Sequence, residues 1–294
     1  MECEVAMRSS KANDPHPLME MLRTIVKSPL ALVMFWPAVL LIFGLSAWKY
    51  WGSEHVANRY HGLVPEKIRV SPQPDYVRSD IVQAVYRDTA MQGVSLLDRQ
   101  ATTKIASAFS MHPWVRKVIS VRKLPGGEID VRLQYRTPVA MVHVYKPNQE
   151  DDRSYFFPVD GDGILLPTSE FTTSETLEYL YIEVPGVYTT NPVGSTFGDG
   201  RVEAAASLAE YLSPFRNEIG IRSIGVYGDP RQMEIPQLEL VTPNDARIFW
   251  GSPPGVEQPG EATAKMKLKR LKASNPDDLS DLRIAAPINP NSRS

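Results

Sequence analysis

The feature that most constrains the fold is a long apolar segment near the N-terminus. No charged residue lies between Lys27 and Lys49. A helix of about 20 residues, rising 1.5 Å per residue, covers the ~30 Å hydrocarbon layer of a bilayer. Aromatic residues crowd the C-terminal end of the segment, where amphipathic rings favour the headgroup level. We therefore expect one transmembrane helix over residues 29–51.

A buried core helix and a cleaved signal peptide are the alternatives for this segment. A core helix is disfavoured because the segment lacks amphipathic periodicity. A signal peptide would have a shorter apolar run and small residues at its end, whereas Trp48 directly follows Leu45-Ser46-Ala47. The basic residues on either side only lean toward a cytoplasmic N-terminus. That orientation would make the chain a single-pass inner (cytoplasmic) membrane protein with extracytoplasmic domains.

Composition limits the remaining choices. A chain of 294 residues with 43% hydrophobic content is expected to form about two folded units. The net charge of −2 argues against a general nucleic-acid binder. Cys3 is the only cysteine, so no intramolecular disulfide can form.

Changes in pattern divide the chain into six segments. We expect a cytoplasmic tail (1–28), the transmembrane helix (29–51), a juxtamembrane connector (52–64), a first domain (65–137), a second domain (138–288) and a C-terminal tail (289–294). Two histidines in the connector, His55 and His61, have no cysteine or further histidine nearby. Solvated side chains are therefore expected there rather than a metal site.

The first domain has the pattern of a small α+β module. The predicted elements are a strand around Ile68–Val70, a helix capped by Ser79, a helix capped by Asp98 and stopped by Pro113, and two strands over 118–123 and 129–135 around a Pro-Gly-Gly turn. Each strand alternates apolar and polar residues, and each helix has an apolar stripe. The order is therefore strand, helix, helix, strand, strand.

His112 and Trp114 lie between the second helix and the next strand. His112 precedes a proline, which disfavours helical conformation at that residue. A lone histidine without an acidic or cysteine partner is a poor catalytic candidate, so we interpret His112 as part of a turn. Trp114 is expected to fix this corner of the fold through its large apolar surface.

The second domain is predicted to be rich in β-structure, with two helices. Its predicted strands are 139–145, 155–159, 164–166, 179–184, 221–227, 238–241 and 247–250, and its predicted helices are 201–212 and 261–273. Gly, Pro, Asn and Asp separate these segments. The "DGDG" of residues 160–163 resembles the start of a calcium loop, but the further ligands of such a loop are missing. A hairpin turn is therefore favoured there.

Several motifs together resemble one protein family. They are "HPWVRKVISVRKLPGGEIDVRLQYRTPVAMV", "PVDGDGILLP", "NDARIFWG", "KMKLKRLKA" and "SDLRIAA". The order of elements over 65–137 resembles a POTRA (polypeptide-transport-associated) domain. The motifs in sequence resemble the FtsQ/DivIB family of bacterial cell-division proteins, and they cover nearly the whole chain.

The resemblance implies an α+β fold, in which a transmembrane helix is followed by a β-α-α-β-β POTRA-type domain and an FtsQ-type β domain. It also implies a non-enzymatic scaffold at the division septum. Its partners would be other single-pass division proteins, similar to FtsB and FtsL, which bind by β-strand addition. Neither nucleic acid nor a small-molecule substrate is implied.

The resemblance further implies that partners dock at the C-terminal edge of the second domain. The expected partner-binding residues are Asp281, Leu282, Arg283, Ile284, Ala285 and Ala286. A strand at the edge of a sheet has unpaired N–H and C=O groups that another chain can bind. Pro287 cannot donate a ladder hydrogen bond and limits the site. The alternative is an ordinary closing strand without a partner.

No catalytic or cofactor motif stands out in this sequence. It contains no Gly-x-Ser-x-Gly elbow and no Walker-type phosphate loop. We therefore predict that the chain is not an enzyme and uses neither a cofactor nor a metal. The alternative function is a POTRA-type accessory protein that binds polypeptides and passes them to an outer-membrane barrel.

Overall fold

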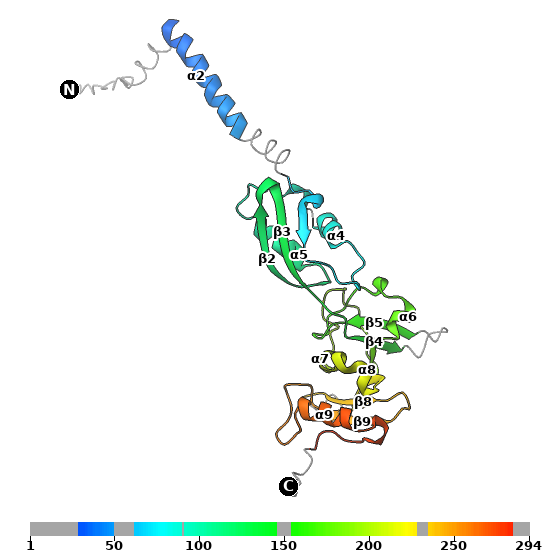
Figure 1. Cartoon of the computed structure of the whole chain (residues 1–294). Coiled ribbons are helices and arrows are strands. Elements are labelled where there is room, and N and C mark those ends of the chain that lie inside the picture. The colour runs from blue at the N-terminus through cyan, green and yellow to red at the C-terminus, as the bar shows by residue number, and fades with distance from the viewer. Residues whose placement is uncertain (1–28, 50–61, 90, 146–153, 228–234, 285–294) are drawn as a thin grey trace, which may run out of the picture. The chain divides into compact units, whose positions relative to one another are not determined.

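The computed structural model describes residues 29–49, 62–89, 91–145, 154–227 and 235–284 (Figure 1). Contacts divide the chain into two units, Met1–Gly62 and Leu63–Ser294. The second unit contains a three-stranded and a six-stranded sheet together with helices. The fold is therefore α+β. The predicted tails, 1–28 and 289–294, and most of the predicted connector lie outside the described residues.

Helix α2 in the first unit corrects the prediction of a membrane span. It covers Pro29–Ala47 and contains Pro37. Within the described ranges, no helix combines the length and the apolarity needed to cross a membrane. The predicted transmembrane helix over 29–51 and the predicted inner-membrane location are therefore wrong.

The three-stranded sheet has the order β1-β3-β2. Its strands are β1 (Ile68–Val70), β2 (Val115–Leu124) and β3 (Glu128–Tyr135), with helices α4 (Ile81–Asp88) and α5 (Ala101–Ser110) and the short 3-10 helices η2 (Pro65–Lys67), η3 (Met91–Gly93) and η4 (Pro125–Gly127). Strand β3 pairs in parallel with β1 and antiparallel with β2. Alternate residues of β3 are buried against both helices. The predicted order of a strand, two helices and two strands is present.

The caps of these two helices differ from the predicted ones. Asp80, rather than Ser79, caps α4 by accepting a hydrogen bond from the backbone N–H of Gln83. The Ser79 hydroxyl instead donates to Glu170, which is far away in sequence. Asp98 accepts from the N–H of Gln100, before the first turn of α5. The cap of α4 moves by one residue, because Ser and Asp have similar cap preferences. At α5 the cap position is Gln100, two residues after Asp98, and it makes no side-chain cap bond.

Trp114 lies at the corner between α5 and β2, and it is fully buried. Its Nε1 donates to a carboxylate oxygen of Glu170 at 2.8 Å. The imidazole of His112 accepts at Nδ1 a hydrogen bond from the N–H of Trp114. His112 is half-buried, and burial lowers its pKa, although the charges of Glu170 and Asp88 oppose this effect. The geometry of a turn therefore accounts for both residues.

The six-stranded sheet has the order β5-β4-β6-β7-β8-β9. Its strands are β4 (Ala140–Tyr145), β5 (Ser154–Val159), β6 (Leu180–Glu183), β7 (Ser223–Tyr227), β8 (Gln237–Val241) and β9 (Arg247–Gly251). Strand β6 pairs in parallel with β4 and β7, and the other neighbours are antiparallel. Strand β9 therefore lies at one edge and β5 at the other.

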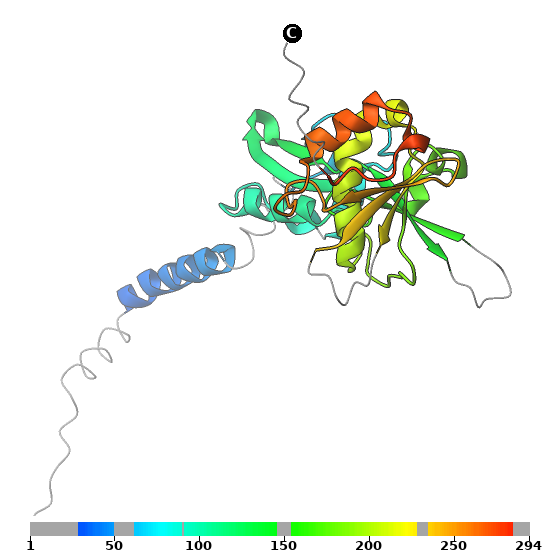
Figure 2. The ribbon, with the colours of Figure 1, turned by 90° about the horizontal axis from the view of Figure 1, so that it is seen from below.

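Two longer helices cover one face of this sheet. Figure 2 shows α7 (Gly200–Leu212, yellow) and α9 (Ala264–Ala273, orange) on the same side of the strands. Their apolar residues share one core with alternate residues of the strands. The short helices α6 (Thr173–Thr176), α8 (Arg216–Ile219), η5 (Thr168–Glu170), η6 (Ser213–Phe215) and η7 (Pro276–Asp278) lie in the connections. We call the opposite face of the sheet the open face.

The predicted strand over 164–166 is wrong, because only two isolated bridges form there. The preceding turn is the predicted hairpin. Asp160 accepts hydrogen bonds from the N–H groups of Asp162 and Ile164. A Cβ on Gly161 would lie 2.2 Å from a carboxylate oxygen of Glu210 on α7. The glycine therefore allows the turn to pack closely against the helix.

Candidate partner-binding edge

The predicted site lies beside β9, the last strand of the six-stranded sheet. We call residues Ser280–Ile284 the C-terminal segment. The N–H of Phe249 donates to the carbonyl of Ser280 at 2.9 Å, and the N–H of Leu282 donates to the carbonyl of Phe249 at 2.9 Å. The C-terminal segment therefore runs alongside β9 and bonds to a single residue of it.

This arrangement corrects the expectation of a regular final strand. The C-terminal segment forms isolated bridges, a parallel one between Phe249 and Asp281 and an antiparallel one between Glu261 and Ile284. Leu282 is fully buried in the core, whereas the side chain of Ile284 is 65% exposed. The other two predicted site residues, Ala285 and Ala286, lie outside the described residues.

Most main-chain groups of the C-terminal segment already have partners. The N–H of Arg283 donates to the Asp281 carboxylate at 2.8 Å, and its carbonyl accepts from the N–H of Ala262 at 2.8 Å. Arg270 donates to the carbonyls of Leu282 and Ile284. The N–H and C=O of Asp281 point away from β9 because their neighbours bond to Phe249. Among the described residues, no hydrogen bond reaches either group.

The side chain of Arg283 lies on the open face at this edge. Its guanidinium group donates to the Asp281 carboxylate at 2.6 Å and to the hydroxyl of Tyr227 at 3.0 Å. It also lies 5.3 Å from the ring centre of Phe249. Hydrogen bonds from Arg283 hold the pKa of Asp281 below its usual range. The edge therefore presents a guanidinium group that is held in place by one carboxylate and two rings.

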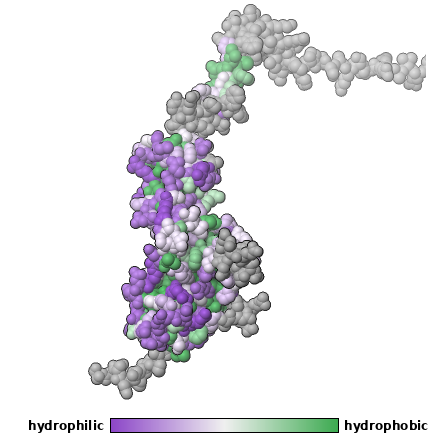
Figure 3. All heavy atoms as spheres, turned by 90° about the vertical axis from the view of Figure 1, so that its right-hand side faces the viewer, coloured by the Kyte–Doolittle hydropathy of each residue, from purple (hydrophilic) through white to green (hydrophobic). Residues whose placement is uncertain are grey.

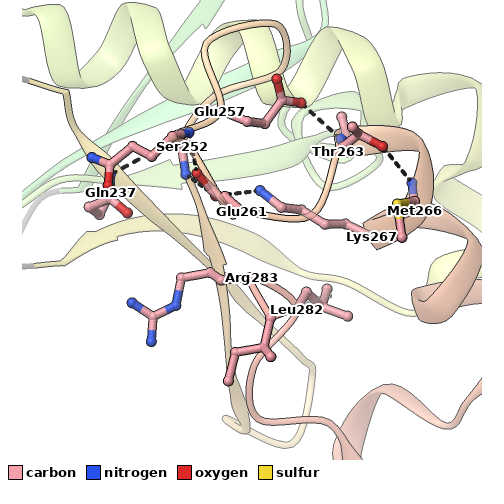
Figure 4. A network of polar contacts seen from close by, with 12 residues as sticks. Gln237, Ser252, Glu257, Glu261, Thr263, Met266, Lys267, Leu282 and Arg283 are labelled. Carbon is pink, nitrogen blue, oxygen red and sulfur yellow. Dashed lines mark hydrogen bonds and ion pairs between the residues drawn. The ribbon is translucent and has the colours of Figure 1, made fainter. Parts of the chain in front are cut away.

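A buried ion pair lies behind the edge, and we call it the Lys267–Glu261 pair (Figure 4). The side chain of Lys267 is 0% exposed, and its Nζ donates to Glu261 Oε1 at 2.6 Å. Nζ also lies 5.1 Å from the ring centre of Trp250. Glu261 accepts further hydrogen bonds from the N–H groups of Ser252 and Gln258. Both charges are thus compensated inside the protein.

The pair ties the loop of residues 252–262 to the end of β9. Burial alone would raise the pKa of Glu261, but the hydrogen bonds from Lys267 and from two backbone N–H groups outweigh it and lower the pKa. Gly251 has φ of 93°, and a Cβ there would lie 2.1 Å from Glu261 Oε1. Only glycine fits at this position. The loop that bonds to Arg283 is therefore firmly held.

Sequence reasoning missed Lys267, although the sequence contains a signal for it. The buried residues of α9 are Ala264, Lys267, Leu268 and Leu271. Their spacing is that of one helix face, so the apolar stripe itself places Lys267 on the buried side. A lysine at such a position indicates a buried acidic partner.

Comparisons with known proteins do not assign this chain to a family. No family model matches the chain, and no curated protein matches it significantly. In the part of the chain that the structure describes, no group of three His, Cys, Asp or Glu side chains could hold a metal ion. The family resemblance therefore rests on the sequence motifs.

Proposed function

We propose that the chain is a non-enzymatic scaffold of the bacterial division machinery, which recruits partner division proteins similar to FtsB and FtsL. Two observations support the proposal. The motifs of the sequence resemble those of FtsQ/DivIB proteins. The C-terminal segment lies at the edge of the six-stranded sheet, and the main-chain groups of Asp281 point away from β9. The position of the Asp281 main-chain groups at the sheet edge supports strand addition as the binding mode.

In this mode a partner adds a strand along the C-terminal segment. The N–H and C=O of Asp281 supply the first pair of main-chain hydrogen bonds. Further pairing requires that the hydrogen bond between Ala262 and Arg283 open, since the Arg283 carbonyl is otherwise occupied. The incoming strand donates a new hydrogen bond to the Arg283 carbonyl in place of the one from Ala262, so the number of hydrogen bonds at this carbonyl does not change. The exposed side chain of Ile284 adds an apolar contact for the partner.

The surface is consistent with recognition through an edge. In Figure 3, the coloured surface beyond residue 62 on the visible face is mostly hydrophilic, with small hydrophobic patches among polar residues. Partners that bind by strand addition gain affinity from main-chain hydrogen bonds and selectivity from a few side chains. A broad apolar patch is not needed for this mode.

Affinity purification of the tagged full chain from its own cells, followed by mass spectrometry, tests the proposal. The informative variant is Ile284→Asp, which places a charge on the outer edge beside Asp281. The matched control is Ile119→Asp on β2, because Ile119 is 61% exposed and belongs to the other sheet. Thermal melts of both variants should stay close to that of the wild type, since both side chains are exposed.

We expect single-pass division proteins among the captured partners, with capture reduced at least about tenfold by Ile284→Asp, since a desolvated contact at an edge is worth ~1–2 kcal/mol. Capture by Ile119→Asp should be unchanged. Equal capture by both variants would exclude the edge. Recovery of an outer-membrane barrel in place of division proteins would favour the transport alternative.

A further inference from the structure

The open face of the six-stranded sheet carries a groove that the proposed edge does not use. The strand register places His143, Glu183, Gly225, Glu239 and Phe249 in one row across β4, β6, β7, β8 and β9. Directly opposite residues on neighbouring strands point to the same face. The row therefore crosses the open face at right angles to the strands.

Gly225 makes the middle of this row hollow. A cavity of about 580 Å³ lies here, and we call it the Gly225 groove. Its lining comes from β4, from β6 and the turn after it, and from β7, β8 and β9. Strand β6 ends at Glu183, whereas β7 continues two residues beyond its last pair with β6, to Tyr227. The early end of β6 opens the groove on that side.

The groove contains more acidic than basic charge. Glu239 is only 5% exposed, and among the described residues its ionic partner is Arg247, whose side chain is 67% exposed. Glu183 also lines the groove and is half-buried, and among the described residues it has no ion pair. Two carboxylates thus face one guanidinium group, which itself reaches into solvent. Glu183 is thus a partly buried carboxylate without an ionic partner among the described residues, and such a group favours a cationic ligand.

A second observation points to an occupant. His143 lines the groove, and its Nε2 atom is buried without a hydrogen-bond partner among the residues that the structure describes. A buried polar atom of this kind is unfavourable unless a ligand or water completes the bond. The imidazole stacks on Phe156, with ring centres 5.0 Å apart. The groove therefore combines an unsatisfied polar atom, an aromatic wall and an acidic floor.

We propose that the Gly225 groove binds an extended segment of a partner protein that carries a lysine or arginine side chain. The cationic group of that side chain lies over Gly225, between the carboxylates of Glu183 and Glu239. Its aliphatic stem packs along the aromatic wall formed by His143 and Tyr145, which both line the groove. A polar main-chain group of the partner bonds to His143 Nε2. This site is separate from the C-terminal segment and does not depend on it.

Selection from a random nonapeptide display library on the full chain tests the proposal. We expect the retained peptides to be enriched in lysine or arginine. Replacing that residue by norleucine should weaken binding roughly tenfold, as for loss of a charge-assisted hydrogen bond. Binding should also weaken as the salt concentration rises.

Two variants of the chain locate the site. Glu183→Gln removes one carboxylate, and we expect roughly tenfold weaker binding of the selected peptides. Gly225→Ala places a Cβ 2.8 Å from Glu239 Oε1, so that this carboxylate must shift and the hollow is filled. The control Glu178→Gln neutralises an exposed carboxylate elsewhere and should leave binding unchanged. Thermal melts establish that each variant is folded.

Three outcomes would overturn the proposal. The first is a selection that retains no peptides, or peptides without basic enrichment. The second is binding that is equally strong in folded Glu183→Gln and Gly225→Ala variants. The third is peptide binding that appears only after Lys146, Arg153 and Arg231 are replaced by glutamine, because the chain's own basic residues would then be the occupants. Reduced capture of division proteins by the Ile284→Asp variant tests the proposed function at the C-terminal segment and does not test the Gly225 groove.

Discussion

At the scale of single residues, the Lys267–Glu261 pair is the strongest electrostatic feature behind the edge. The Lys267 side chain is 0% exposed and the Glu261 side chain 7% exposed. Desolvation of two charges is expensive, and their attraction offsets it only with good geometry and further hydrogen bonds. Glu261 has such bonds from two backbone N–H groups. Removing one partner should therefore cost more than removing both.

A double-mutant cycle tests this coupling. We predict that Glu261→Gln lowers the free energy of unfolding by about 3–5 kcal/mol, because Lys267 is left buried and uncompensated. The double variant Glu261→Gln/Lys267→Met should recover at least about half of that loss, since methionine fills a similar volume without charge. Urea denaturation at neutral pH measures the wild type, the two single variants Glu261→Gln and Lys267→Met, and the double variant. Losses that simply add would show that the two side chains are not coupled.

At the scale of elements, the connection from η5 to α6 docks against the start of α4. Glu170 accepts hydrogen bonds from Trp114 Nε1, from the hydroxyl of Ser79 and from the N–H of Arg78. Thr172 and Glu175 form a capping box that begins α6. The bonds from Arg78 and Ser79 span 92 and 91 residues of the sequence, so the Glu170 carboxylate holds two distant elements together.

The contact made by Glu170 should depend on pH. Burial alone would raise the pKa of Glu170, but the bonds from Trp114, Ser79 and Arg78 outweigh it and hold the pKa below 4.5. An acidic group whose pKa is lower in the folded state contributes its full stabilisation of the folded state when the pH is above the pKa that the group has in the unfolded chain. That stabilisation is lost as the pH falls from about 4.5 through the folded value.

Hydrogen exchange at the amides of Arg78 and Ser79 measures this dependence. We predict that their protection factors fall relative to those of β3 as the pH drops below about 4.5. In Glu170→Gln, protection should be lower at neutral pH and should change little over the same range. The control Glu66→Gln removes an exposed carboxylate and should behave as the wild type. A pH-independent wild type would contradict the assignment.

At the scale of the whole molecule, the two sheets of the second unit share contacts. Leu166 and Phe171, which follow β5 in the chain, pack in the core of the three-stranded sheet. Arg136, just after β3, donates to Asp160 at 2.6 Å, and the two side chains are 16% and 2% exposed. Residues of the second predicted domain therefore complete the core of the first.

We predict that residues 63–294 unfold in one cooperative transition. This part of the chain contains only Trp114 and Trp250, one beside each sheet. The variants Trp250→Phe and Trp114→Phe thus each retain a single local reporter. In either variant, tryptophan fluorescence and far-ultraviolet circular dichroism should give the same urea midpoint. Midpoints that differ between the two probes would show that the sheets unfold separately.

Local patterns in the sequence determined most of the helices and strands. Alternating burial in β3 and the apolar stripe of α9 follow from which side chains avoid water, so they can be predicted without knowing their neighbours. The order of elements in the first sheet was predictable for the same reason. The apolar run of α2 predicted a membrane span wrongly, since among the described residues no helix is long and apolar enough to cross a membrane.

Only the tertiary structure decided which distant residues meet. The C-terminal segment bonds to Phe249 and Ala262, and nothing in its own pattern names these partners. The run of residues 164–166 is apolar like a strand, yet it forms only isolated bridges, with Val159 and with Thr196. The Gly225 groove needs Glu183 on β6 and Glu239 on β8 to lie on either side of Gly225 on β7. Hydrophobic burial thus sets the elements locally, whereas hydrogen bonds and ion pairs between distant segments set the sites.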